Sequence, residues 1–231
     1  ELVDATGSAA VVRLFDGSKV VEGDALAGLI FQVRGAAPGA LKFPRNVGLQ
    51  RNLKKAVAEG KLPAIFSRTW FDVGVHADEI YAKVNILATS YEPTAIPKMQ
   101  HELLGFLKCQ PDFSQSYIRR VGNLGIRDGG RIRGDYCLTL IDVQAGRRFS
   151  DAVGRCAWPI EYWDPRKGVT LEHLPPGHSY EIPLRSLKVT GTENLWAAGK
   201  CLSAEKLAQA SARVAGTCWA MGDGLARAIA A

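Results

Sequence analysis

The two ends of this 231-residue chain carry the patterns that most constrain its fold. Residues 195–198 form a short apolar run of the buried-strand type, Gly199 supplies a turn, and the alanine-rich residues 203–230 predict a helix. At the other end, residues 2–4 have the same strand character and are followed by the small residues 5–7. The sequence therefore predicts that the two ends lie side by side in one layer with the last helix.

The chain between these ends changes from strand patterns to helix patterns. We expect strands at residues 29–34, 64–71, 79–87 and 157–162, a weak helix at 42–59, helices at 97–107 and 113–121, a glycine-rich loop at 122–134 and a turn near Asp142. This order predicts an α/β chain (α+β overall) in which residues 1–13 and 180–231 form one domain. Residues 14–179 are then an inserted β-rich and helical domain that caps it.

Composition excludes few classes of protein. Apolar residues make up 47% of the chain, which is ample for a core, and the net charge of +6 suits an anionic cofactor or substrate as well as it suits nucleic acid. The five cysteines form no C-x-x-C pair, and four scattered histidines lack metal-ligand spacing. No run approaches the roughly 20 apolar residues that span a bilayer. We expect a cytoplasmic protein with reduced thiols, no metal and no membrane partner.

An ordered series of short motifs then becomes informative. They are Asp4-Ala5-Thr6-Gly7, Gly125-Ile126-Arg127-Asp128, Gly134-Asp135-Tyr136, and the segments 145–149, 182–187 and 194–199. Together they resemble the C-terminal portion of the FAD-dependent oxidoreductase superfamily that shares the glutathione-reductase type of FAD domain. The resemblance implies FAD as cofactor and an incomplete Rossmann-like FAD-binding domain with an inserted substrate cap.

The glycine-rich turn that would hold the pyrophosphate in such a domain is absent from these residues. Residues 2–4 read as a strand already under way, so we expect an N-terminal dinucleotide-binding half to come from a preceding segment or from a partner chain. A cleaved precursor, a separate chain and a truncation remain equally open.

The resemblance also assigns the cofactor-binding residues at the strand ends. Ala5, Thr6 and Gly7 would let the chain pass close beneath the dinucleotide, with Gly7 free to adopt a positive φ. Gly199 would let the backbone approach the ribityl–phosphate part of FAD, and Lys200 stands where many relatives have an acid. An ordinary strand exit and a solvated lysine are the competing interpretations.

The start of the last helix is the second part of the expected FAD site. The resemblance aligns Arg213, Val214, Gly216 and Thr217 with a stretch that directs a helix N-terminus at the flavin N1/O2 edge. There Arg213 would bind an anion and support the negative charge that develops on reduction. The alternative is a surface arginine early in a helix.

Arginines gather in the glycine-rich part of the chain at Arg119, Arg120, Arg127, Arg131 and Arg133. A nucleic-acid surface, a solvated face and a functional site compete, and the chain has no recognised nucleic-acid module. The resemblance places Arg127 toward the flavin, where its guanidinium could clamp a substrate carboxylate. For Arg147 and Arg148, structural ion pairs are favoured over such a role. Proton transfer has only loose candidates, His178 and Tyr180.

These observations favour a flavoprotein oxidoreductase that transfers a hydride between FAD and a small polar or anionic substrate. Arg213 and Arg127 are the candidate catalytic residues. The alternatives are a noncatalytic structural subunit with a degenerate FAD fold and a basic RNA-binding module; we expect no nucleic-acid partner.

Overall fold

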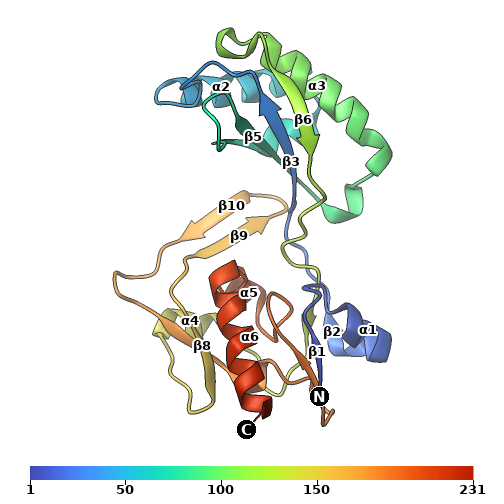
Figure 1. The fold of residues 1–231 in the computed structure, drawn as a ribbon, viewed down its shortest axis with the longest axis vertical. Helices are drawn as coiled ribbons and strands as arrows, with labels where there is room; N and C mark the ends of the chain where they lie inside the picture. The colour runs from blue at the N-terminus through green and yellow to red at the C-terminus, as the bar shows by residue number, and fades with distance from the viewer. Residues whose placement is uncertain (231) are drawn as a thin grey trace. The chain divides into compact units, whose positions relative to one another are not determined.

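A computed structural model describes residues 1–230 and divides them into two compact units (Figure 1). One unit combines residues 1–25 with the chain from residue 127 onward, and the other is the continuous segment 26–126. Both units mix helices and strands, which agrees with the predicted α/β class.

The two ends of the chain pair in the first unit, as the sequence predicts. Strand β1 (Leu2–Asp4) runs parallel to β12 (Leu195–Ala197), with Leu2 opposite Leu195 and Asp4 opposite Ala197. The pair is a two-stranded sheet in the structure as described. The carboxyl ends of both strands therefore lie at the same end of this sheet.

Short antiparallel pairs and four helices complete this unit. The strand pairs are β2 (Val20–Val21) with β7 (Arg131–Ile132), β8 (Ala152–Cys156) with β11 (Tyr180–Pro183), and β9 (Ile160–Asp164) with β10 (Gly168–Glu172). The helices are α1 (Ala10–Asp16), α4 (Leu140–Ala145), α5 (Lys206–Ala212) and α6 (Ala215–Ala230). Helix α5 packs on β9 and α6 packs on β8 (Figure 1). Small side chains such as Ala208 and Ala212 allow this close approach, and Met221 and Leu225 fill the same core.

The second unit is an antiparallel sheet with helices on one face. Its strand order is β4-β5-β3-β6, and its elements are β3 (Ala27–Arg34), α2 (Arg45–Ala58), β4 (Thr69–Val73), β5 (Ile80–Ile86), α3 (Ile96–Lys108) and β6 (Tyr117–Val121). Alternate residues of β3, including Phe31 and Val33, are fully buried against Leu53 of α2 and Leu103 of α3. The apolar faces of α2 and α3 and one face of the sheet thus form a single core. Short 3-10 turns occupy Gly17–Lys19, Ala64–Arg68, Ala88–Ser90, Pro93–Ala95, Pro111–Phe113 and Leu184–Ser186.

Several expected elements differ from those observed. The helix expected at 113–121 is wrong, because that segment is the end of a 3-10 turn followed by β6. The strand expected at 64–71 starts with a 3-10 turn, and β4 begins at Thr69. The turn expected near Asp142 is the helix α4. The long last helix is divided into α5 and α6 at residues 213–214.

The compact units divide the chain at other positions than the expected domains. Residues 14–25 and 127–179 pack with the two ends of the chain, whereas the expected boundaries fell after residues 13 and 179. Val143, Ile160 and Tyr162 share a core with α5 and α6, which explains this packing. Compactness does not assign FAD or substrate to either unit, so those parts of the division stay predictions.

Candidate functional site

Asp4 organises the carboxyl end of β1. Its fully buried carboxylate accepts hydrogen bonds from the Thr6 backbone N–H (3.0 Å), the Thr6 hydroxyl (2.7 Å) and the Val12 N–H (3.0 Å). Thr6 in turn accepts a bond from the Ala10 N–H (3.0 Å). These bonds tie the turn of residues 5–7 to β1 and to α1, because the donors lie on Thr6 and on the first residues of α1.

Gly7 adopts the positive φ that the sequence predicts for it, and Gly199 has a positive φ as well. Gly7 has φ +72° and Gly199 has φ +90°, a region that favours glycine. A Cβ on Gly7 would lie 2.6 Å from Cε of Lys200, so the lysine stem occupies the space above Gly7. A Cβ on Gly199 would contact Sγ of Cys218 at 3.8 Å. Two of the predicted glycines therefore lie where the chain passes close to other side chains.

Three of the predicted site residues, Arg127, Lys200 and Arg213, form a half-buried cluster of cations in the first unit. Burial, together with the charge of Arg213, lowers the pKa of Arg127 to about 10. Burial and Arg213 also lower the pKa of Lys200, and burial lowers the pKa of Arg213 itself. The cluster disfavours its own positive charge, which is the electrostatic condition for binding an anion.

The positions of the three cations are set by neighbours from β9 and α5. The Arg213 guanidinium donates to the Glu161 carbonyl (3.0 Å) and lies 3.8 Å from the Glu161 carboxylate. Arg127 stacks on Trp163, with 4.1 Å from Cζ to the ring centroid. Sequence patterns did not predict Glu161 and Trp163 as neighbours of the arginines.

Gln209 joins the two loops that carry the other cations. Its buried side-chain amide donates to the carbonyl of Arg127 (3.1 Å) and to that of Lys200 (3.0 Å). The sequence places Gln209 in an alanine-rich segment, and nothing in that pattern points to either carbonyl. Because one amide binds both carbonyls, the backbone at Arg127 is held close to the backbone at Lys200.

The break between α5 and α6 places Arg213 directly before a helix N-terminus. Helix α6 begins at Ala215, and the Cys218 N–H donates to the Val214 carbonyl (2.9 Å). The N–H groups of the first turn have no partner within the helix, and they carry partial positive charge. Gly216 faces open space, since a Cβ there would meet nothing within 4 Å, and Thr217 is buried. Val214, Gly216 and Thr217 thus lie beside the cation cluster.

Asp128 follows Arg127 and is buried beneath this region. Its carboxylate lies 3.3 Å from Nε of Arg131, and Coulombic effects of Asp128 extend to Lys200 and Arg213. Burial raises the pKa of Asp128, and Arg131 only partly opposes this.

The remaining candidates of the sequence analysis take structural roles or lie elsewhere. The arginine group is divided, with Arg119 and Arg120 exposed on β6 of the other unit. Arg147 pairs with Asp142 (2.9 Å) and Arg148 with Glu181 (3.5 Å), which confirms ion pairing for both. The two candidates for proton transfer, His178 and Tyr180, also have partners. A ring nitrogen of His178 lies 2.7 Å from the Val143 carbonyl, and fully buried Tyr180 donates to the Ser211 hydroxyl (2.8 Å).

Within residues 1–230, no three His, Cys, Asp or Glu side chains are arranged to hold a metal ion. No helix in that range has the length and apolar character needed to cross a membrane.

The β1–β12 pair, the two positive-φ glycines and the three cations lie in the same unit of the structure. The model of the FAD dependent oxidoreductase family matches residues 2–231. The chain belongs to this family, whose cofactor is FAD. No curated protein and no solved structure matches the chain.

Proposed function

We propose that the chain forms the C-terminal part of a glutathione-reductase-type FAD domain, with a substrate cap. In this role it transfers a hydride between FAD and a small polar or anionic substrate. The observation that carries the proposal is the half-buried cluster of Arg127, Lys200 and Arg213 beside the ends of β1 and β12. Three cations whose charge is disfavoured by burial and by one another gain most from a bound anion.

The residues present fit an FAD molecule. The turn of residues 5–7 and Gly199 leave backbone rather than bulky side chains at the strand ends, and Gly216 opens the start of α6. We assign FAD binding to Ala5, Thr6, Gly7, Gly199, Lys200, Arg213, Val214, Gly216 and Thr217. When bound, FAD supplies the ring that accepts or donates the hydride.

The chain's own residues then have separate tasks. Arg213 and the N–H groups at the start of α6 would stabilise negative charge at the flavin edge, because both present positive charge and neither needs to move. Arg127, already oriented by Trp163, would clamp a substrate carboxylate with two of its three N–H-bearing nitrogens. Residues from 14–179 would supply the rest of the substrate surface.

The edge of β1 supports the proposed N-terminal partner. β1 pairs with β12 along one side. Among the described strands, none pairs with the other side of β1. Parallel sheets are normally covered on both faces and extended by further strands. A polypeptide that carries the glycine-rich half of the FAD domain would add to this edge. Five cysteines outside disulfides support the proposal of a reducing, cytoplasmic setting.

The decisive experiment is an FAD titration followed by flavin absorbance, with the upstream half of the domain added where the chain alone does not bind. We expect a yellow complex of one FAD per chain. Absence of bound flavin under both conditions would overturn the proposal in favour of a noncatalytic structural subunit. Retention on RNA that weakens steeply with salt would instead favour the RNA-binding alternative.

A further inference from the structure

Strand β4 lies at an edge of the four-stranded sheet, and part of its backbone has no partner. Positions of an antiparallel pair alternate between residues that bond across to each other and residues whose N–H and C=O groups point outward. The Gly74 N–H donates to the Glu79 carbonyl (2.8 Å), so this pair and every second pair along β4 bond across to β5. The N–H and C=O groups of Phe71 and Val73 therefore point away from β5.

The backbone groups of Phe71 and Val73 form the open part of this edge. In the described part of the chain they make no hydrogen bond. The next outward position, Thr69, is closed, because its N–H donates to the Phe66 carbonyl and its carbonyl accepts from the Gln50 amide (2.9 Å). An extended chain that runs antiparallel to β4 could therefore bond to both groups of Phe71 and both groups of Val73.

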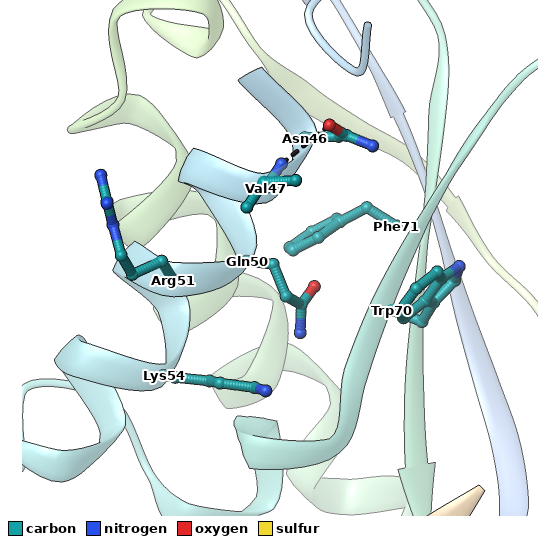
Figure 2. Close-up of a pocket in the computed structure, with 7 residues that line it drawn as sticks. All are labelled: Asn46, Val47, Gln50, Arg51, Lys54, Trp70 and Phe71. Carbon is teal, nitrogen blue, oxygen red and sulfur yellow. Dashed lines mark hydrogen bonds between the residues drawn. The ribbon is translucent and has the colours of Figure 1, made fainter. Parts of the chain in front are cut away.

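Apolar side chains flank the open edge on both faces of the sheet. Phe71 points toward helix α2 and borders a groove of about 400 Å³, whereas Trp70 lies on the opposite face of the strand (Figure 2). Val47 and Trp70 each expose 54% of their surface, Val73 exposes 71% and Val75 exposes 84%. An added strand would cover these side chains, because its own side chains alternate between the same two faces.

The unpaired charges on the α2 side of this edge are positive. Lys54 extends from α2 across the groove toward β4 (Figure 2). Lys42 lines a second hollow at the other end of β4, together with Val73 and Val75. Neither lysine forms an ion pair with any residue in the described range 1–230.

The acidic side chains near the edge already have partners. Asp72 pairs with Lys83 on the face opposite α2. Glu79 is buried and accepts a hydrogen bond from the Gln32 amide (3.0 Å). The lysines at the two ends of the open edge therefore lack a local counter-charge, which favours a partner that brings acidic groups.

A second copy of this chain is a poorer partner for the edge. Antiparallel pairing of two β4 strands would place both α2 helices on the same face of one continuous sheet. Helix α2 packs on β4 and carries four cations and no acidic residue, namely Arg45, Arg51, Lys54 and Lys55. Two such helices side by side would repel each other.

We propose that the edge of β4 binds an extended acidic peptide segment of a partner protein as an added antiparallel strand. The segment places apolar residues opposite Phe71 and Val73, on the face covered by α2. Acidic residues two positions further out at each end reach Lys54 and Lys42. The backbone bonds supply affinity, and the lysines select an acidic partner. The site is separate from the proposed FAD residues, which all lie in the other unit.

The test uses the full chain and a capped heptapeptide, Glu-Thr-Val-Thr-Ile-Thr-Glu, as the probe. Calorimetry measures the affinity, and amide exchange followed by NMR locates the contact. We expect saturable binding that protects the N–H groups of Phe71 and Val73 from exchange. The Asp72 N–H, which already faces β5, should show no change.

Modified peptides separate strand pairing from nonspecific adsorption. Methylation of the isoleucine N–H, which would donate to the Phe71 carbonyl, should weaken binding about tenfold. Methylation of the central threonine N–H, which points away from β4, should leave the affinity unchanged. Replacement of both glutamates by glutamine should weaken binding about fivefold.

Protein variants test the same contacts from the other side. Lys54→Gln should weaken binding about threefold, whereas Lys98→Gln, which alters an exposed lysine of α3, should have no effect. Val73→Pro removes an outward N–H without touching a bond to β5, so it should abolish binding of a folded chain.

Three results would overturn the proposal. They are equal affinities of the two methylated peptides, an unchanged affinity of the glutamine peptide, and protection of the Phe71 and Val73 N–H groups in a dimer of the free protein. The last result would assign the edge to a second copy of the chain.

Discussion

At the scale of single residues, three cations that share one half-buried region need an explanation. Like charges repel more strongly where water is excluded, and burial already disfavours each charge alone. Glu161 and Asp128 act on these charges, and burial raises the pKa of Asp128. A bound anion would lower the repulsion among the three cations, which is the physical reason for the proposed site.

The first prediction concerns Arg213. Arg213→Gln should weaken FAD binding about tenfold, because a charge-assisted contact is lost, while the free energy of unfolding without FAD changes by less than about 1 kcal/mol. The loss of the Glu161 contact is offset by relief of repulsion with Arg127 and Lys200. Flavin fluorescence titration and urea unfolding measure the two effects.

Arg227→Gln is the matched control for Arg213→Gln. Arg227 lies near the other end of α6, is largely exposed and pairs with Asp223. Its replacement should leave FAD affinity unchanged. Equal losses in both variants would mean that the helix charge as a whole, and not Arg213, attracts FAD.

The second prediction concerns Ser211, which links two buried groups. Its hydroxyl accepts from Tyr180 (2.8 Å) and donates to the Trp158 carbonyl (2.6 Å). Ser211→Ala should lower the free energy of unfolding by about 2 kcal/mol, because both partners lose their bond. Tyr180→Phe should cost about 1 kcal/mol, and urea unfolding measures both. If Tyr180→Phe abolishes turnover although the variant stays folded, Tyr180 would have a role in proton transfer.

Sequence patterns predicted the backbone of the site better than its side-chain contacts. The positive φ of Gly7 could be predicted because glycine at a strand end has a local reason to adopt it. Gln209 was missed as the link between Arg127 and Lys200 because the contact joins residues about 80 positions apart in the chain. Such contacts follow from packing, which a single sequence does not show.

At the scale of elements, competition between local and tertiary preferences explains the wrong helix at 113–121. The segment has a spacing that fits a helix, with apolar or aromatic residues at Phe113, Tyr117, Ile118 and Val121, yet residues 117–121 form the edge strand β6 beside β3. Pairing with β3 satisfies the backbone along that side of the sheet, and β-branched residues suit the strand. Helix α3 lacked this competition, and its prediction was correct to within one residue at each end.

Helix α4 shows a signal that was present but not used. Thr139 and Asp142 form a capping box, in which the threonine hydroxyl accepts from the Asp142 N–H (3.1 Å) and the carboxylate accepts from the Thr139 N–H (2.9 Å). The Asp142 carboxylate also binds the Tyr136 hydroxyl (2.7 Å) and Arg147 (2.9 Å). The threonine and the acid three residues later predict a helix start, although the helix itself is too short for a periodic pattern.

The third prediction follows from the acid in this box. Burial acts to raise the pKa of Asp142, but the bonds from Thr139, Tyr136 and Arg147 outweigh it and the pKa is lowered. Its contribution to stability is therefore present above the ordinary aspartate pKa of about 3.9 and is lost as the pH falls through the lowered value. Urea unfolding at about pH 6 and about pH 3 should show a smaller acid loss in Asp142→Asn than in the parent protein.

Asp135→Asn is the control for the pH prediction, because Asp135 is exposed. Its acid loss should equal that of the parent protein. If Asp142→Asn also behaves like the parent, the acid sensitivity arises elsewhere in the chain.

At the scale of the whole molecule, the pairing of the ends was predictable and the boundary between the units was not. Matching strand patterns at residues 2–4 and 195–198 identified the pair across the length of the chain. The boundary depends on which core takes up residues 127–179. Short segments such as β8 and β9 carry too few apolar residues to decide this by pattern, and they gain their core from α5 and α6.

The fourth prediction is that residues 26–126 fold on their own. The segment has a core of its own, with Phe31, Val33, Leu53 and Leu103 among its buried residues, and all its strands pair within it. Its two ends meet, because Gly28 and Gly125 exchange hydrogen bonds of 3.0 and 2.8 Å. An isolated fragment should therefore show a cooperative thermal transition by circular dichroism.

The complementary variant replaces residues 26–126 with a short Gly–Ser linker. The ends of the segment meet at the Gly28–Gly125 bridge, so a linker can close the gap without stretching the rest of the chain. The proposed FAD residues all lie in the retained part, so FAD binding should persist while turnover of a substrate is lost. A linker variant that folds but no longer binds FAD would place part of the cofactor site in the excised segment, and an unfolded fragment 26–126 would show that its core is not sufficient alone.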